Sequence, residues 1–287
     1  MSIYEKDLFG PSRHQVAIER IRHFCENRRV LVAFSGGKDS QCVYHLCEEA
    51  GIEFDAQYSI TRFEPPELLG FIREHYPKVK FRRAYDQNLI ADIEYNGLPK
   101  RYNGRWCCKA KHAKTEGYGI TLIGVRWQES PRRRETWRMS GFKQDKSFYL
   151  CPIIDWSERD VWEYLGGGHP HCSLYDEGMK RIGCVMCPLC PGQMKGQSSR
   201  WPKIANVLRK GADAFVSRMR SQGFVTGHGN DVPDWCRAAD PEEEYWQRWL
   251  HTGQTAKPIG CEDDGQEEPC LFAGTGFDEA DGNGDRE

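Results

Sequence analysis

The chain has 287 residues, of which 39% are hydrophobic and 29% are charged, and its mean hydropathy is −0.72. Apolar runs such as 30–34 are far shorter than the roughly 20 residues that span a bilayer. No charged-then-apolar leader opens the chain, so we expect a cytoplasmic protein without membrane segments. The net charge of −2 hides an acidic end, because residues 262–287 hold ten acidic side chains and one basic. The other residues include 39 basic and 32 acidic ones, a balance that suits an anionic ligand such as a nucleotide or nucleic acid.

Apolar runs alternate with amphipathic stretches over the first half of the chain. The pattern predicts helices over 12–28, 38–50 and 66–75, and strands over 30–34, 54–60, 79–82 and 119–125. Strands that alternate with helices form parallel sheets with right-handed crossovers. We therefore predict a doubly wound α/β domain over residues 1–170, with its ligand at the carboxyl ends of the strands.

The composition changes after about residue 170, where Pro, Gly, Cys and Trp become frequent. We predict a mainly helical region over 171–260, with its longer helices near 201–220 and 241–250, and an acidic disordered tail over 261–287. The tryptophans between 201 and 249 fit a packing face better than a surface for stacking on bases. Local support for a nucleic-acid surface is limited to four basic residues, Arg200, Lys203, Arg209 and Lys210.

A glycine-rich loop joins the first predicted strand to the next helix, and it consists of Ser35, Gly36, Gly37, Lys38, Asp39 and Ser40. The glycines permit a tight turn, and the helix start presents unpaired N–H groups to an anion. Lys38 adds a positive charge, whereas the Asp39 carboxylate would repel a phosphate unless it binds Mg²⁺. The spacing is not that of a P-loop. We predict a nucleotide-phosphate site that uses Mg²⁺, with a plain capped turn as the alternative.

The loop resembles the pyrophosphate-binding signature of the adenine nucleotide α-hydrolase (N-type ATP pyrophosphatase) superfamily. Further stretches are similar to its phosphoadenosine phosphosulfate (PAPS) reductase branch: Arg105–Lys109, Gly124–Arg126 with Arg133, Pro152–Ser157, and Gly183-Cys184 with Cys187-Pro188. The resemblance implies an adenine nucleotide-binding sheet in which Lys38 and Asp39 act in catalysis. It also implies that Gly124, Arg126 and Arg133 or Arg134 lie near the nucleotide, and that residues 58–62 contact the adenosine.

Thirteen cysteines are many for this length, and their grouping indicates a metal site in a reducing compartment rather than a disulfide framework. Cys107, Cys108, Cys184 and Cys187 supply four thiolates, which suit a 4Fe–4S cluster or tetrahedral zinc. Cys190 is an alternative to one of these ligands. The resemblance favours the 4Fe–4S cluster, because related reductases and sulfur-transfer proteins carry a similar Cys-Cys…Cys-x-x-Cys pattern. The cysteines expected in the core are Cys25, Cys42, Cys47 and Cys151.

Three functions fit these features. The first is adenylation of an acceptor by ATP, with release of pyrophosphate, followed by sulfur transfer to the activated acceptor. It is similar to DNA phosphorothioation and RNA thiolation, which implies a nucleic-acid acceptor and a sulfur-donor protein such as a cysteine desulfurase. The second is reduction of PAPS or adenylylsulfate to sulfite through attack by a thiolate. The third is a non-enzymatic partner protein gated by nucleotide or redox state.

The resemblance itself separates the first two functions. Reductases of this branch typically have a degenerate first loop, whereas Asp39 and the full Ser-Gly-Gly-x-Asp-Ser pattern are present here. They also carry their nucleophile in a C-terminal Glu-Cys-Gly-Leu-His motif, and the contexts of Cys261 and Cys270 do not match it. We therefore predict the adenylating function first.

Overall fold

The computed structural model describes residues 2–6, 10–84, 88–102, 106–111, 116–142, 147–223 and 233–255. The predicted tail over 261–287, with Cys261 and Cys270, lies outside the described residues, as does Arg105. Within the described ranges, no helix is both long and apolar enough to cross a membrane.

A six-stranded sheet forms the centre of the fold, in the order β3-β2-β1-β4-β6-β5. Its strands are β1 (Val30–Ala33), β2 (Phe54–Ile60), β3 (Val79–Arg83), β4 (Ile120–Leu122), β5 (Ser140–Phe142) and β6 (Phe148–Leu150). Val30 lies opposite Phe54 of β2 and Ile120 of β4, and all pairs are parallel except β5 with β6. This arrangement confirms the predicted parallel α/β sheet. Strands β5 and β6 were not predicted, because each has three residues and neither lies in an apolar run that is free of proline and as long as the one over 119–125 that contains β4.

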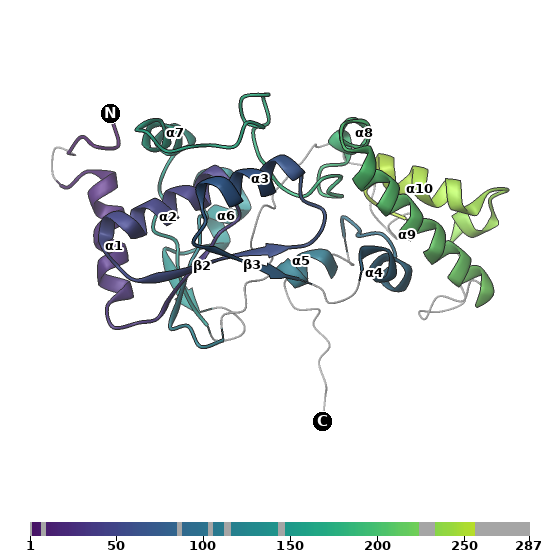
Figure 1. Cartoon of the computed structure of the whole chain (residues 1–287), viewed down its shortest axis with the longest axis horizontal. Helices are drawn as coiled ribbons and strands as arrows, with labels where there is room; N and C mark the ends of the chain where they lie inside the picture. Colours follow the sequence, from purple (N-terminus) through teal and green to yellow (C-terminus); the bar gives the residue numbers. More distant parts are fainter. Residues whose placement is uncertain are drawn as a thin grey trace.

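The helices are α1 (Arg13–Cys25), α2 (Lys38–Ala50), α3 (Pro66–His75), α4 (Leu89–Asn96), α5 (Trp106–Lys111), α6 (Pro131–Thr136), α7 (Glu158–Gly166), α8 (Pro191–Arg200), α9 (Pro202–Ser221) and α10 (Pro241–Thr252). The bounds of α2 and α3 are the predicted ones. In Figure 1, α2 and α3 lie above β2 and β3, while α4 and α5 belong to the long crossover that leads from β3 back to β4.

Helices α8, α9 and α10 gather beside α4 at one end of the molecule (Figure 1). Gly211 of α9 lies so close to α4 that a Cβ there would stand 2.7 Å from Cβ of Ile93. Trp249 of α10 donates its indole N–H to the carbonyl of Pro99, at 2.6 Å. The side chains of Trp201, Trp235, Trp246 and Trp249 are all buried. These tryptophans therefore form a packing face, as predicted.

The core consists of one large cluster of buried residues from the sheet and its helices, and a smaller cluster that includes Ile123, Tyr149 and Cys151. Val30, Leu31 and Val32 of the central strand β1 are almost completely buried, as a strand covered on both faces should be. The cysteines predicted to be core residues are all buried: Cys25, Cys42, Cys47 and Cys151. Burial of apolar surface from both faces of the sheet stabilises the position of the loops at its edges.

Candidate functional site

The glycine-rich loop lies between β1 and α2, at the carboxyl end of the central strand, as predicted. Gly36 has φ +72°, and a Cβ there would stand 2.6 Å from Cδ1 of Ile72 in α3, so this position accepts only glycine without displacement. The amide of Gln41 donates to the carbonyl of Gly36 at 2.8 Å, and the hydroxyl of Ser40 donates to the carbonyl of Gly37 at 2.8 Å. These bonds fix the loop against the first turn of α2.

The start of α2 presents backbone donors at its open end. The N–H of Gly37 donates to the hydroxyl of Ser35 at 3.4 Å, and the N–H of Lys38 donates to the hydroxyl of Tyr175 at 2.9 Å. In the described part of the chain, the N–H groups of Asp39 and Ser40 have no hydrogen-bond partner. Two open donors and the positive end of the helix dipole together make an anion site.

Asp39 stands between two cations. The Nε of Arg126 donates to Oδ1 of Asp39 at 2.5 Å, and Nζ of Lys38 lies 3.9 Å from Oδ2. Burial by itself would lower the pKa of Arg126, but the charge and hydrogen bond of Asp39, together with the charges of Glu129 and Glu158, raise it. Lys38 is also buried, and its Nζ lies 3.5 Å from Oε1 of Glu158 at the start of α7. Mg²⁺ in nucleotide sites is commonly bound by one or two carboxylates and by phosphate oxygens of the substrate. Asp39 is a carboxylate beside a phosphate site, so its chemistry fits the predicted metal.

The segment that follows β4 packs directly on the backbone of Asp39. A Cβ on Gly124 would stand 2.8 Å from the carbonyl carbon and oxygen of Asp39, so only glycine permits this approach. The contact brings Arg126, two residues further on, to the Asp39 side chain. Gly124 therefore serves the site through packing.

The three consecutive arginines of α6 differ in their surroundings. Arg133 is buried and pairs with Oε2 of Glu129 at 2.7 Å, whereas Arg132 and Arg134 are exposed. Burial lowers the pKa of Arg133, against the opposing effect of Glu129. Arg181 reaches the other oxygen of Glu129 at 2.6 Å. Of the predicted phosphate-binding arginines, the structure thus orients Arg133 inward and leaves Arg134 at the surface.

The four predicted cluster ligands, Cys107, Cys108, Cys184 and Cys187, come from α5 and from the loop before α8 and are called the cysteine quartet below. A hydrogen bond with Cys108, burial, and the charges of the other quartet thiolates raise the pKa of Cys107. The Cys107 thiol therefore interacts electrostatically with the other three thiols, and their role as a ligand set stays a prediction. Among the described residues, however, no group of three or more His, Cys, Asp or Glu side chains already has a metal-binding arrangement. The donor chemistry of four thiols fits a 4Fe–4S cluster or zinc.

The loop of Cys184 is fixed to the segment that follows β2. The N–H of Val185 donates to the carbonyl of Phe63 at 2.6 Å, and the hydroxyl of Thr61 lies 3.9 Å from Sγ of Cys184. The same Thr61 hydroxyl donates to Oε1 of the buried Glu64 at 2.6 Å. Because β2 is the parallel neighbour of β1, this segment and the phosphate loop leave the same edge of the sheet.

Comparison with known proteins shows the family of the chain. Residues 29–190 match the phosphoadenosine phosphosulfate reductase domain, and this match covers more than half of the chain. The chain belongs to the PAPS reductase domain family.

Relatives in this family include proteins with and without an assigned activity. An uncharacterized protein of Methanocaldococcus jannaschii is 34% identical over 230 residues, which are 73% of this chain and 46% of that protein. The chain thus spans about half the length of that relative. An adenosine 5′-phosphosulfate reductase of Shouchella clausii is 26% identical, over 66% of this chain and 84% of the enzyme. The crystal structure of a PAPS reductase from Candida auris is 14% identical, with a TM-score of 0.47 over 58% of this chain and 87% of that one.

Several residues at the site of this PAPS reductase family member were not predicted from sequence. Tyr175 contacts the loop through its hydroxyl, Lys180 through its carbonyl and Glu158 through an ion pair with Lys38, while Arg181 forms an ion pair with Glu129. All four come from residues 158–181, more than a hundred positions beyond the loop. Each of them is an ordinary polar residue in its local sequence, so no motif marks it.

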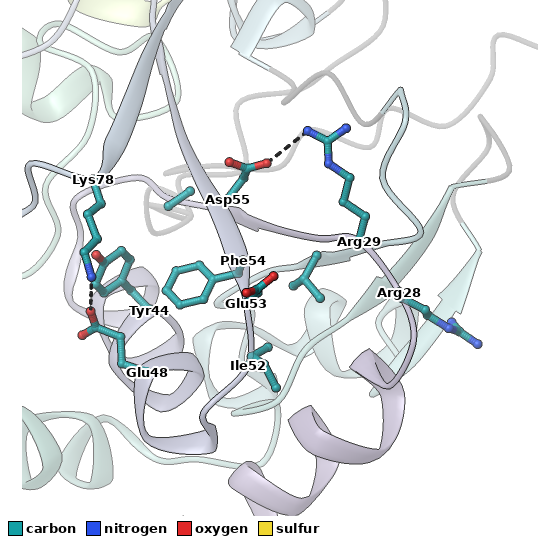
Figure 2. Close-up of a pocket in the computed structure, with 11 residues that line it drawn as sticks. Arg28, Arg29, Tyr44, Glu48, Ile52, Glu53, Phe54, Asp55 and Lys78 are labelled. Carbon is teal, nitrogen blue, oxygen red and sulfur yellow. Dashed lines mark hydrogen bonds and ion pairs between the residues drawn. The ribbon is translucent and has the colours of Figure 1, made fainter.

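A cavity of about 810 Å³ lies at the opposite end of the central strands. Figure 2 shows it with the Arg29–Asp55 and Lys78–Glu48 pairs on either side of Phe54. The cavity begins at the amino ends of β1 and β2, whereas the phosphate loop follows the carboxyl end of β1. No loop or quartet residue lines it, so this cavity is separate from the candidate site.

Proposed function

We propose that this member of the PAPS reductase domain family uses ATP to adenylate an acceptor and so prepares it for sulfur transfer. The observation that carries the proposal is the position of Asp39, a carboxylate at an anion site, with Lys38 on one side and Arg126 on the other. An acidic side chain in a phosphate site is favourable when the ligand arrives with Mg²⁺, as ATP does.

The acceptor oxygen attacks the α-phosphorus of ATP, forms a new P–O bond and gives its proton to water. The bond from the α-phosphorus to the bridging oxygen breaks, and pyrophosphate leaves. The open N–H groups of Asp39 and Ser40 and the ammonium of Lys38 stabilise the leaving charge. Asp39 would hold Mg²⁺, which would supply positive charge to offset the negative charge of the phosphates. A sulfur nucleophile then bonds to the activated atom and expels AMP.

The cysteine quartet supports the sulfur-transfer half of the proposal. Its four residues would hold a 4Fe–4S cluster, which supplies thiophilic iron when bound. The loop of Cys184 is attached to the segment after β2, on the sheet edge that carries the phosphate loop. We include a nucleic acid as acceptor because basic residues outnumber acidic ones, 39 to 32, outside residues 262–287. This chemistry requires a sulfur donor, and we propose a protein such as a cysteine desulfurase for that role.

Sulfonucleotide reduction is the second candidate, and the relative from Shouchella clausii favours it, since that protein is an adenosine 5′-phosphosulfate reductase. In that reaction a cysteine thiolate attacks the sulfur of the sulfonucleotide, the S–O bond to the phosphate breaks, and an enzyme thiosulfonate remains. A dithiol reductant then releases sulfite.

A calorimetric comparison of Mg–ATP, adenylylsulfate and PAPS on anaerobically purified protein separates the two functions. Adenylation predicts the highest affinity for Mg–ATP, loss of that preference in Asp39→Ala, and pyrophosphate release when RNA or DNA acceptors are added. Glu53→Gln, in the cavity at the other end of the strands, is the matched control and should change none of these. Preference for a sulfonucleotide, together with thiol-dependent sulfite release, would instead establish the reductase.

A further inference from the structure

Tyr175 accepts a hydrogen bond from one of the backbone N–H groups of the phosphate site. Its hydroxyl accepts the N–H of Lys38, which is the first residue of α2, at 2.9 Å. The aromatic ring is held by an edge contact with Trp162 of α7, with centroids 5.0 Å apart at 88°. Burial raises the pKa of Tyr175, so the hydroxyl stays neutral. A neutral oxygen thus stands where a phosphate oxygen would accept the same hydrogen bond.

The side chain of Lys38 is held by the same segment. Its Nζ donates to the carbonyl of Lys180 at 3.1 Å and lies 5.6 Å from the centre of the Tyr175 ring. Residues 172–181 form a compact run of turns, with Cys172 and Leu174 completely buried at its base. Both groups through which Lys38 would bind a phosphate, its N–H and its ammonium, are therefore engaged by residues 172–181.

The chain from this segment leads directly to the cysteine quartet. Arg181 pairs with Glu129, Ile182 is buried, and Cys184 follows two residues later. In Figure 1 the chain between α7 and α8 crosses the side of the molecule on which α3 lies. Lys180 and Cys184 are four positions apart, so a change in the contacts of Lys180 can alter the position of Cys184.

We propose that residues 172–181 are a plug that phosphate displaces. A nucleotide phosphate takes the N–H and the ammonium of Lys38, the Tyr175 hydroxyl and the Lys180 carbonyl are released, and the loop of Cys184 and Cys187 becomes more accessible. By thermodynamic linkage, any ligand that stabilises the open form of the loop of Cys184 and Cys187 also strengthens nucleotide binding. The inference rests on the phosphate-binding half of the proposed function and holds for ATP and for a sulfonucleotide alike.

The test uses inorganic pyrophosphate, which has no base or sulfur and so does not depend on the reaction catalysed. Tyr175→Phe removes the hydroxyl and keeps the ring against Trp162. The plug predicts that this variant binds pyrophosphate about 2- to 10-fold more tightly than the wild type, the range that corresponds to one neutral hydrogen bond. Tyr118→Phe is the control, because it removes a hydroxyl that donates to Asp55 at the other end of the sheet. Its affinity for pyrophosphate should equal that of the wild type.

A second measurement on the wild-type protein needs no variant. Pyrophosphate should accelerate amide exchange over residues 172–181 and tryptic cleavage after Lys180 and Arg181, while it slows exchange at residues 38–41. Weaker binding by Tyr175→Phe, or protection of residues 172–181 by pyrophosphate, would show that Tyr175 is a ligand that closes over the phosphate, and would overturn the plug. Equal affinities, or no pyrophosphate binding by either protein, also overturn it.

Discussion

Gly124, two residues after β4, packs against the peptide that joins Asp39 to Ser40. The space beside its α-carbon is filled by the Asp39 carbonyl group, which a Cβ would approach to 2.8 Å. One glycine thus sets the distance between the start of α2 and the strand that delivers Arg126 to Asp39.

Replacing this glycine should damage both stability and binding. In Gly124→Ala the methyl group must displace backbone atoms rather than the end of a flexible side chain, so we expect the free energy of unfolding to fall by about 1–3 kcal/mol. Affinity for Mg–ATP should fall with it. Urea unfolding and calorimetry measure the two effects. Gly166→Ala in α7, where nothing lies within 4 Å of the added Cβ, is the control and should leave both unchanged.

Removing Arg126 should expose the charge of Asp39. Arg126→Gln leaves the Asp39 carboxylate without its buried cation, so Asp39 should repel the nucleotide phosphates more strongly. An added repulsion of about 1–2 kcal/mol corresponds to a loss in nucleotide affinity of about 5- to 30-fold. Arg126→Lys keeps the charge and should recover part of that affinity. Nucleotide titrations of both variants provide the check. Equal affinities for Arg126→Gln and the wild type would mean that Asp39 does not face the phosphates.

The quartet predicts where iron is bound. Anaerobically purified protein should contain iron and show the brown colour of a thiolate-ligated cluster, and Cys184→Ser should lose both. Cys236→Ser, at a buried cysteine outside the quartet, should retain them. Iron analysis and visible absorption give the answer, and a Cys184→Ser protein with unchanged iron would exclude this ligand set.

The ionisation of Asp55 should make the free energy of unfolding depend on pH. Hydrogen bonds from Lys80 and Tyr118, together with Arg29, lower the pKa of Asp55 from 3.8 to about 2. The folded state therefore binds this proton more weakly than the unfolded state, so the stabilisation is complete above about pH 4 and is lost as the pH falls towards 2. The difference in unfolding free energy between the wild type and Asp55→Asn should shrink over that window. Denaturant unfolding between pH 2 and pH 6 measures it; a difference that stays constant with pH would contradict the role of these bonds.

Local sequence was sufficient for the elements that build the site. Apolar runs bounded by Gly, Pro and charged residues predicted β1, β2 and β3 and the limits of α2 and α3, because each of these is specified by residues within one or two turns. The strand predicted over 119–125 is shorter, at Ile120–Leu122, because the chain from Gly124 turns to pack on α2. The division near residue 170 and the roles of Lys38 and Asp39 in catalysis stay predictions.

The sequence by itself determined the parallel sheet, the phosphate loop and the four cysteines, since spacing and residue type carry that information. Tertiary structure alone decided that Arg126 neutralises Asp39, that Arg133 faces inward while Arg134 does not, and that Tyr175 holds the N–H of Lys38. The Arg126–Asp39 contact joins residues 87 positions apart, and the Tyr175–Lys38 contact joins residues 137 positions apart. They depend on how side chains meet after the sheet has formed, and no short stretch of sequence records that geometry.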